Sequence, residues 1–383
     1  MAEIAVVGNG TYSGQTAAIA GSYNGGSAAA FNVYVDGGEV QGDIVGGAVH
    51  GSGTVEAVTL VVNRGTVQGH LLGGSKTSGT VQEAGIIVNG GTIFGDIVAG
   101  GHAGTVGNTS VVVNGGVISG SITKGTAARS EGARASVAVV GNKAFIGGNI
   151  EADDVTLRNL SRSGYADGFD NYAGTIAAGK LTLDNVQVGL QASLAVSSIE
   201  LINGSNTSAA LGASCVLDTL HLGSGTTFGA YKDAATPLAA SEHESSLTLT
   251  TLQAGTGATL NANIAFTADS VLMLEGTLTM GSDVALTTGM SLTLSESMLA
   301  ELYGHKAVTL FSGVDNLTLD HVAIADGETL NANGVFSNLN VGYDYSLAFV
   351  GGSVNLAAVP EPASASLTLA ALVLLCARRR RKA

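Results

Sequence analysis

Residues 33–44 read Val-Tyr-Val-Asp-Gly-Gly-Glu-Val-Gln-Gly-Asp-Ile, and variants of this stretch return at 60–71, 86–97, 111–122 and 139–150. The Asp or Asn at the fourth place recurs after steps of 27, 26, 25 and 28 residues, at Asp36, Asn63, Asn89, Asn114 and Asn142. Each unit is expected to hold two short strands joined by a turn, and it cannot bury its apolar side chains alone. The repeats therefore predict coils that stack as a parallel β-helix, or β-solenoid.

Stacking of equivalent residues predicts three apolar columns that form the core. The columns are Val33, Leu60, Ile86, Val111 and Val139; Val40, Val67, Ile93, Ile118 and Ile146; and Ile44, Leu71, Ile97, Ile122 and Ile150. Because each column contains only Val, Ile or Leu, it fits a buried position better than a ligand site.

Two polar columns accompany the core. We expect Asp36, Asn63, Asn89, Asn114 and Asn142 to form a structural turn ladder, because Asn tolerates left-handed backbone and stacked amides hydrogen-bond along the column. The column Asp43, His70, Asp96, Ser121 and Asn149 precedes the inward Ile or Leu, so it should be a solvated face. A cation held by its Asp-His-Asp run is the alternative interpretation.

The rest of the body keeps its strand character while the repeat blurs. Residues 151–294 alternate like half-buried strands and predict an irregular continuation of the solenoid. Residues 295–304, Ser-Glu-Ser-Met-Leu-Ala-Glu-Leu-Tyr-Gly, predict one short helix. With the strands expected after it, this helix indicates a cap over the open end of the stack. The expected division is 1–150, 151–294, 295–358 and 359–383.

The composition fits an exported, non-enzymatic β protein. Gly makes up 56 of 383 residues, charged residues are 12% and Trp is absent, which fits short strands between turns. Five of the 16 Lys and Arg lie in the tail. The rest of the chain therefore has 11 Lys and Arg and 30 Asp and Glu, which gives it a net charge near −19. Nucleic acid is therefore excluded as a partner. Cys215 is alone in the body, so no disulfide framework is expected.

The C-terminal stretch combines three features. Val359-Pro360-Glu361-Pro362 precedes an uncharged run over 363–377, and Arg378, Arg379, Arg380, Arg381 and Lys382 follow. A helix over that run measures about 22 Å, short of the ~30 Å hydrocarbon core, and the basic block stops it on the cytoplasmic side. This order resembles the PEP-CTERM sorting signal of Gram-negative bacteria.

The resemblance implies an exosortase as partner, a membrane-embedded protease-transpeptidase that cuts near the Pro-Glu-Pro. It also implies a transient anchor in the inner membrane through 363–377 and delivery to the cell surface or matrix, with exopolysaccharide as a further partner. An ordinary anchor that is never cut is the alternative. Residues 1–7 lack the features of a secretory signal, so we expect the signal and further repeats upstream. The repeats resemble autotransporter passenger stalks.

Catalytic candidates are few. Asp153-Asp154, and Asp167 with Asp170, are the strongest acidic groups, while Glu242-His243-Glu244 predicts a charged loop tip. Two carboxylates do not supply the six to eight oxygens that Ca²⁺ takes, so a polar loop is expected at 167–170. No nucleophile triad, phosphate loop or zinc motif is present. We therefore expect a structural or adhesive protein without catalytic residues, metal or cofactor.

The alternative function is a β-helix that binds or cleaves polysaccharide. Such a site requires a concave patch in which a basic residue lies beside two carboxylates.

Overall fold

The computed structural model describes residues 2–8, 10–12, 19–24, 26–161, 174–190, 192–232 and 245–360. The chain divides into two compact units, residues 1–245 and residues 246–383. Strands dominate both units, and α1 (Glu296–Tyr303) is the one helix of the described residues, so the all-β prediction is confirmed. Within those ranges, no helix has the length and apolar character needed to cross a membrane. The predicted span over 363–377 lies outside them.

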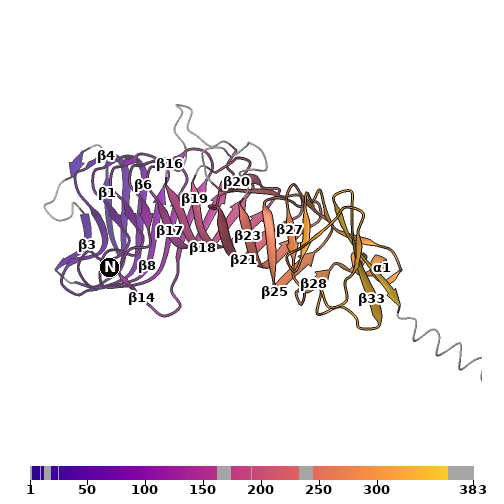
Figure 1. Ribbon diagram of the computed structural model, residues 1–383. Helices are drawn as coiled ribbons and strands as arrows, with labels where there is room; N and C mark the ends of the chain where they lie inside the picture. Colours follow the sequence, from indigo (N-terminus) through magenta and orange to yellow (C-terminus); the bar gives the residue numbers. More distant parts are fainter. Residues whose placement is uncertain are drawn as a thin grey trace, which may run out of the picture. The chain divides into compact units, whose positions relative to one another are not determined.

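The first unit is an array of strands that pair in parallel with the strand one repeat later (Figure 1). Its longest face contains β1 (Ala2–Val7), β4 (Ala28–Val40), β6 (Thr54–Val67), β8 (Thr80–Val88), β11 (Thr105–Val113), β15 (Ala135–Val140), β17 (Ile150–Arg158), β18 (Thr175–Asp184), β19 (Ser193–Ile202) and β21 (Ser214–Leu222). A second face contains β2 (Thr11–Tyr12), β9 (Thr92–Ile93), β12 (Gly116–Ile118) and β16 (Ala144–Ile146). A third contains β3 (Ile19–Asn24), β5 (Ile44–His50), β7 (Leu71–Leu72), β10 (Ile97–Val98) and β13 (Ile122–Thr123). The remaining strands are β14 (Ala128–Arg129), β20 (Asn206–Ala210) and β22 (Thr227–Tyr231).

Two of the three predicted core columns are confirmed by the strand register. Val40, Val67, Ile93, Ile118 and Ile146 pair in succession, as do Ile44, Leu71, Ile97, Ile122 and Ile150. All ten side chains are at most 1% exposed. The repeats at 33–44 and 60–71 form two strands each, as predicted, because β4 and β6 run through two faces without a break, whereas the repeats at 86–97 and 111–122 form three strands each.

The remaining predicted column is wrong at its fifth member. Val137 lies beside Val111, and Val139 lies beside Val113. The reason is a longer turn: six residues separate Val139 from Ile146, whereas four separate Val113 from Ile118. An alignment anchored on the turn Asn therefore slips by two residues, which keeps the same face because side chains alternate with a period of two.

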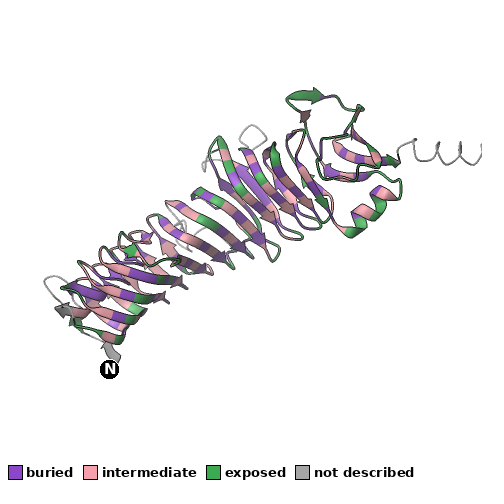
Figure 2. Cartoon of the chain, turned by 90° about the horizontal axis from the view of Figure 1, so that it is seen from below, coloured by how far each residue is buried: buried purple, intermediate pink, exposed green. Residues whose placement is uncertain are grey.

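The register continues beyond residue 150, where the sequence repeat fades. One buried column runs through Val35, Val62, Val88, Val113, Val139, Leu157, Leu183, Leu201 and Leu222. Each of these is at most 1% exposed, and burying one such side chain contributes about 1.5–3 kcal/mol. The strands around them alternate buried and more exposed residues (Figure 2).

The second unit begins with parallel strands and ends with antiparallel ones. Its strands are β23 (Ser246–Ala254), β24 (Thr259–Asn261), β25 (Asn263–Leu274), β26 (Leu278–Met280), β27 (Val284–Leu286), β28 (Ser291–Leu294), β29 (Val308–Ser312), β30 (Leu317–Leu319), β31 (Val322–Ile324), β32 (Thr329–Asn331), β33 (Tyr343–Val350) and β34 (Ser353–Pro360). The predicted helix is confirmed as α1, which begins after Ser295 because the side chain of Ser295 caps the N–H of Met298. Strand β34 pairs antiparallel with both β29 and β33.

Candidate functional site

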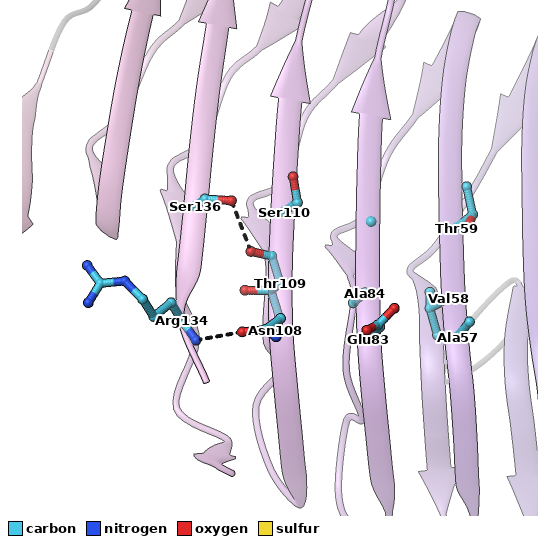
Figure 3. Close-up of a pocket in the computed structure, with 11 residues that line it drawn as sticks. Ala57, Val58, Thr59, Glu83, Ala84, Asn108, Thr109, Ser110, Arg134 and Ser136 are labelled. Carbon is cyan, nitrogen blue, oxygen red and sulfur yellow. Dashed lines mark hydrogen bonds between the residues drawn. The ribbon is translucent and has the colours of Figure 1, made fainter. Parts of the chain in front are cut away.

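A groove of about 490 Å³ lies on the outward side of the longest face, over β6, β8, β11 and β15 (Figure 3). Gly85 lies on its floor, in register with Thr59 on one side and Ser110 on the other. A Cβ on Gly85 would meet no atom nearer than 3.8 Å, so the missing side chain helps to leave the surface hollow. Ser136 continues the row beyond Ser110. The groove therefore presents a row of hydroxyl groups, which can donate and accept hydrogen bonds.

A second row of larger polar side chains borders this groove. Glu83 and Asn108 are in register on β8 and β11, and the N–H of Arg134 donates to Oδ1 of Asn108 at 3.0 Å. The guanidinium of Arg134 forms two hydrogen bonds with Asp154, Nε to Oδ2 at 2.7 Å and Nη2 to Oδ1 at 2.8 Å. These bonds raise the pKa of Arg134. The predicted acidic group at Asp153-Asp154 thus lies beside the groove.

The cations near this groove already have partners in the protein. Arg129 is half-buried and donates to the carbonyl oxygens of Gly107 and Lys124, and burial lowers its pKa. Lys124 Nζ lies 3.5 Å from Glu151 and 4.0 Å from Asp153. The arrangement holds a basic residue beside two carboxylates, as the alternative function requires, but Arg134 and Lys124 already pair with carboxylates of the protein.

The column of Asp43, His70, Asp96, Ser121 and Asn149, at a corner of the coil, has a role that the sequence did not predict. Each side chain accepts a hydrogen bond from the backbone N–H of its equivalent in the next repeat: Asp43 from His70, His70 from Asp96, Asp96 from Ser121, Ser121 from Asn149 and Asn149 from Thr175. The N–H···O and N–H···N distances are 2.8 to 3.0 Å. The column therefore satisfies backbone donors at a corner of the coil, where leaving them unpaired would cost free energy.

Asp43 has an additional partner in this column. Burial alone would raise the pKa of Asp43, but the N–H of His70 and the ammonium of Lys76, 2.7 Å from Oδ2, outweigh burial and hold the pKa below its usual value. His70 accepts from the N–H of Asp96 through its ring atom Nδ1. Among the described residues, no group of three or more His, Cys, Asp and Glu is placed to hold a metal ion.

The predicted turn ladder forms an amide column, in which side-chain hydrogen bonds join four of the five members along the stack. Nδ2 of Asn63 donates to Asp36, Nδ2 of Asn89 to Asn63 at 2.8 Å, and Nδ2 of Asn114 to Asn89 at 2.8 Å. Asn142 instead exchanges two hydrogen bonds with Ser161, at 2.7 and 3.0 Å. The longer turn of the fifth repeat accounts for this change of partner.

Sequence reasoning missed a second set of Asn turns. Asn159, Asn185 and Asn203 all have positive φ, between 53° and 56°, and Nδ2 of Asn185 donates to Asn159 at 2.9 Å. Each of the three follows a buried column Leu by two residues, and that spacing is the signal that would have found them. The other predicted acidic positions, Asp167, Asp170 and 242–244, lie outside the described residues.

The start of the sorting stretch belongs to a strand. In β34, Ala358 pairs with Tyr345, Val359 with Asp344 and Pro360 with Tyr343. Val359 is 58% exposed. Glu361, Pro362 and the basic block at 378–382 lie outside the described residues. The folded part of the second unit therefore continues to Pro360, with no linker before the Pro-Glu-Pro.

Comparison with known proteins adds one finding. Residues 358–382 match the family described as the PEP-CTERM protein-sorting motif. The tail is similar to this sorting signal. Such a motif supports an exported protein that an exosortase sorts, with a precursor that associates with the membrane. No curated protein and no solved structure matches the chain.

Proposed function

We propose that this chain is the precursor of a structural or adhesive protein of the bacterial surface or matrix, built on a parallel β-solenoid. The observation that carries the proposal is the direct junction of two features: β34, the last strand of the body, ends inside a sorting motif. The first unit supplies a stack of repeats in parallel register over nine buried column positions. Such a stack offers long regular faces, which suit scaffolding and adhesion.

The groove over β8 is the proposed adhesive contact, and a neutral glycan is its proposed ligand. The hydroxyls of Thr59, Ser110 and Ser136 match the hydrogen-bonding capacity of sugar hydroxyls. An acidic polysaccharide fits less well, because the two ion-paired oxygens of Asp154 already neutralise Arg134 and the chain as a whole carries a net charge of −14.

Sorting is tested by changing Pro360, Glu361 and Pro362 to Ala and fractionating the cells. We expect the variant to stay in the inner membrane while the unchanged protein reaches the surface or the medium. Replacement of Thr329 by Ser, an exposed position of β32, is the matched control. Release of the triple variant at the normal rate would contradict the role of Pro-Glu-Pro in sorting, whereas retention of the unchanged protein in the inner membrane would favour an ordinary anchor that is never cut.

The adhesive contact is tested by filling the groove with Gly85→Ile. The new side chain has space and suits a strand, so the fold should persist, while binding to a neutral polysaccharide should weaken at least about tenfold. Ser198→Ile, on the same outward row but away from the groove, is the control. Equal binding by both variants would place the contact elsewhere.

One observation favours a second candidate, a polysaccharide-cleaving enzyme: Arg134 lies beside Asp153 and Asp154 at the edge of the groove. Incubation with a panel of uronic-acid polysaccharides distinguishes the two functions. Chain cleavage that is lost in Arg134→Gln would favour the enzyme over the scaffold.

A further inference from the structure

The hairpin of β33 and β34 brings exposed apolar side chains to the point where the sorting tail begins. Tyr343 is in register with Pro360, the last strand residue, and Val341 precedes Tyr343 by two residues. Val341 is 91% exposed, the highest value among the large apolar residues described, and Val359 next to Pro360 is 58% exposed. Both exposed valines therefore lie close, in sequence or in strand register, to the start of the apolar run over 363–377.

The loop that carries Val341 is held in a defined conformation. Asn338 accepts from the N–H of Leu292 at 2.8 Å and donates to the carbonyl oxygen of Leu292 at 2.9 Å. The N–H of Gly342 donates to Oδ1 of Asn340 at 2.9 Å. Because these bonds tie the loop on both sides of Val341, the exposure of Val341 is a property of the folded unit.

Three tyrosines lie beside this loop. The rings of Tyr303 and Tyr343 pack with centroids 4.9 Å apart. The hydroxyl of Tyr345 donates to the carbonyl oxygen of Asn340 at 3.0 Å and lies 3.3 Å from the hydroxyl of Tyr303. A hollow of about 280 Å³ opens between the loop, Tyr343 and Tyr345. Tyr, with an apolar ring and a polar tip, is enriched where protein meets lipid headgroups.

The length of the chain restricts how far this end can lie from a membrane. From Pro360 to Ala363, three residue steps span at most about 11 Å. The headgroup layer on each side of a bilayer is about 5–8 Å thick. When 363–377 occupies the hydrocarbon core, Pro360 and its partner Tyr343 must therefore lie within or just above the headgroups.

We propose that Val341, Tyr343 and Val359 form a lipid-contacting end of the second unit, which rests in the headgroup layer on the outer side of the inner membrane. The proposal rests on the proposed function, since it needs an anchored tail. The contact holds the Pro-Glu-Pro at the membrane surface, where a membrane-embedded protease can reach it. Asp344, which accepts a hydrogen bond from Asn333 at 2.9 Å, makes a zwitterionic surface the better partner than an anionic one.

The absence of Trp from the chain gives a direct test. The full chain carrying Val341→Trp is reconstituted into phosphatidylcholine vesicles with or without brominated acyl chains, and Trp fluorescence is compared. Val350→Trp is the matched control, because Val350 is 52% exposed at the other end of β33, about 24 Å away. We expect brominated lipid to quench Val341→Trp by about twofold or more and to leave Val350→Trp nearly unchanged.

Flotation of the vesicles separates failure of this proposal from failure of the anchor. A chain that floats with the vesicles, while bromine quenches neither variant or both equally, overturns the lipid-contacting end alone. A chain that does not float overturns the anchor and this proposal together.

Discussion

At the scale of single residues, the amide column shows how a repeated turn residue stabilises a stack. Asn89 donates to Asn63 and accepts from Asn114, whereas Asn114 donates to Asn89 and the next turn residue, Asn142, binds Ser161. Each side-chain hydrogen bond contributes about 0.5–1.5 kcal/mol net. The contribution of a turn Asn should therefore depend on its place in the column.

The first prediction compares two positions of this column. Asn89→Ala removes two bonds along the stack and should lower the free energy of unfolding by about 1–2 kcal/mol, while Asn114→Ala should cost roughly half as much. Urea unfolding followed by circular dichroism measures both. An equal decrease in the free energy of unfolding for both variants would mean that Asn stabilises the turn backbone, and that the hydrogen bonds between the amides contribute little.

A second prediction concerns acid. The pKa of Asp43 is below its usual value of 3.8 because the N–H of His70 and the ammonium of Lys76 outweigh burial. A lowered folded pKa means that the stabilisation is complete above the ordinary pKa and disappears as the pH falls through the folded one. Asp43→Asn should therefore have a lower free energy of unfolding than the unchanged protein at neutral pH, and this difference should shrink only below about pH 4. Urea midpoints between pH 7 and pH 2 measure the difference. A gap that stays constant over that range would contradict the assignment.

What the sequence could predict at this scale follows from spacing. The columns of Val40 and Ile44 were predictable because the distance from turn to corner is constant in all five repeats. The fifth member of the Val33 column was not predictable. The alignment was anchored on Asn142, and the turn that contains Asn142 is two residues longer than the equivalent turns. The role of Asp43 and its equivalents was also hidden, because a solvated face and an acceptor for a corner N–H have the same residue types.

At the scale of elements, β34 connects the fold to the sorting signal. Val354, Leu356 and Ala358 are at most 2% exposed, and β34 lies between β29 and β33. The sequence predicted strands after the helix, but it did not predict that the last one continues to Pro360. The antiparallel pairing on both sides was not readable, because it depends on contacts with β29, more than 40 residues earlier in the chain.

The third prediction uses this position of β34. A chain that ends at Pro360 should fold and remain soluble, since it keeps every strand of the part that the structure describes. In a chain that ends at Gly352 the second unit should unfold, because the residues that pack against Leu356 become exposed. The missing burial of Leu356 alone removes about 1.5–3 kcal/mol of stability. Circular dichroism and limited proteolysis measure the outcome. A stable second unit in the shorter chain would show that β34 is dispensable.

At the scale of the whole molecule, the charges are divided between an acidic body and a basic end. The 383 residues carry a net charge of −14, although five of the last six residues are Arg or Lys. Positive charge beside a span sets its orientation, whereas Asp and Glu contribute little. The five basic residues, and not the acidity of the body, should therefore keep the C-terminus in the cytoplasm.

The last prediction changes Arg378, Arg379, Arg380, Arg381 and Lys382 to Gln in a chain with a C-terminal epitope. Without the charges, a run that measures about 22 Å as a helix has nothing to hold its end inside, so the epitope should become sensitive to protease added to spheroplasts. The control replaces the four Arg by Lys, which keeps the charge and should keep the epitope protected. An epitope that stays protected in the Gln variant would mean that the apolar run alone, or a bound partner, retains the tail, and the basic block would then act in recognition and not in orientation.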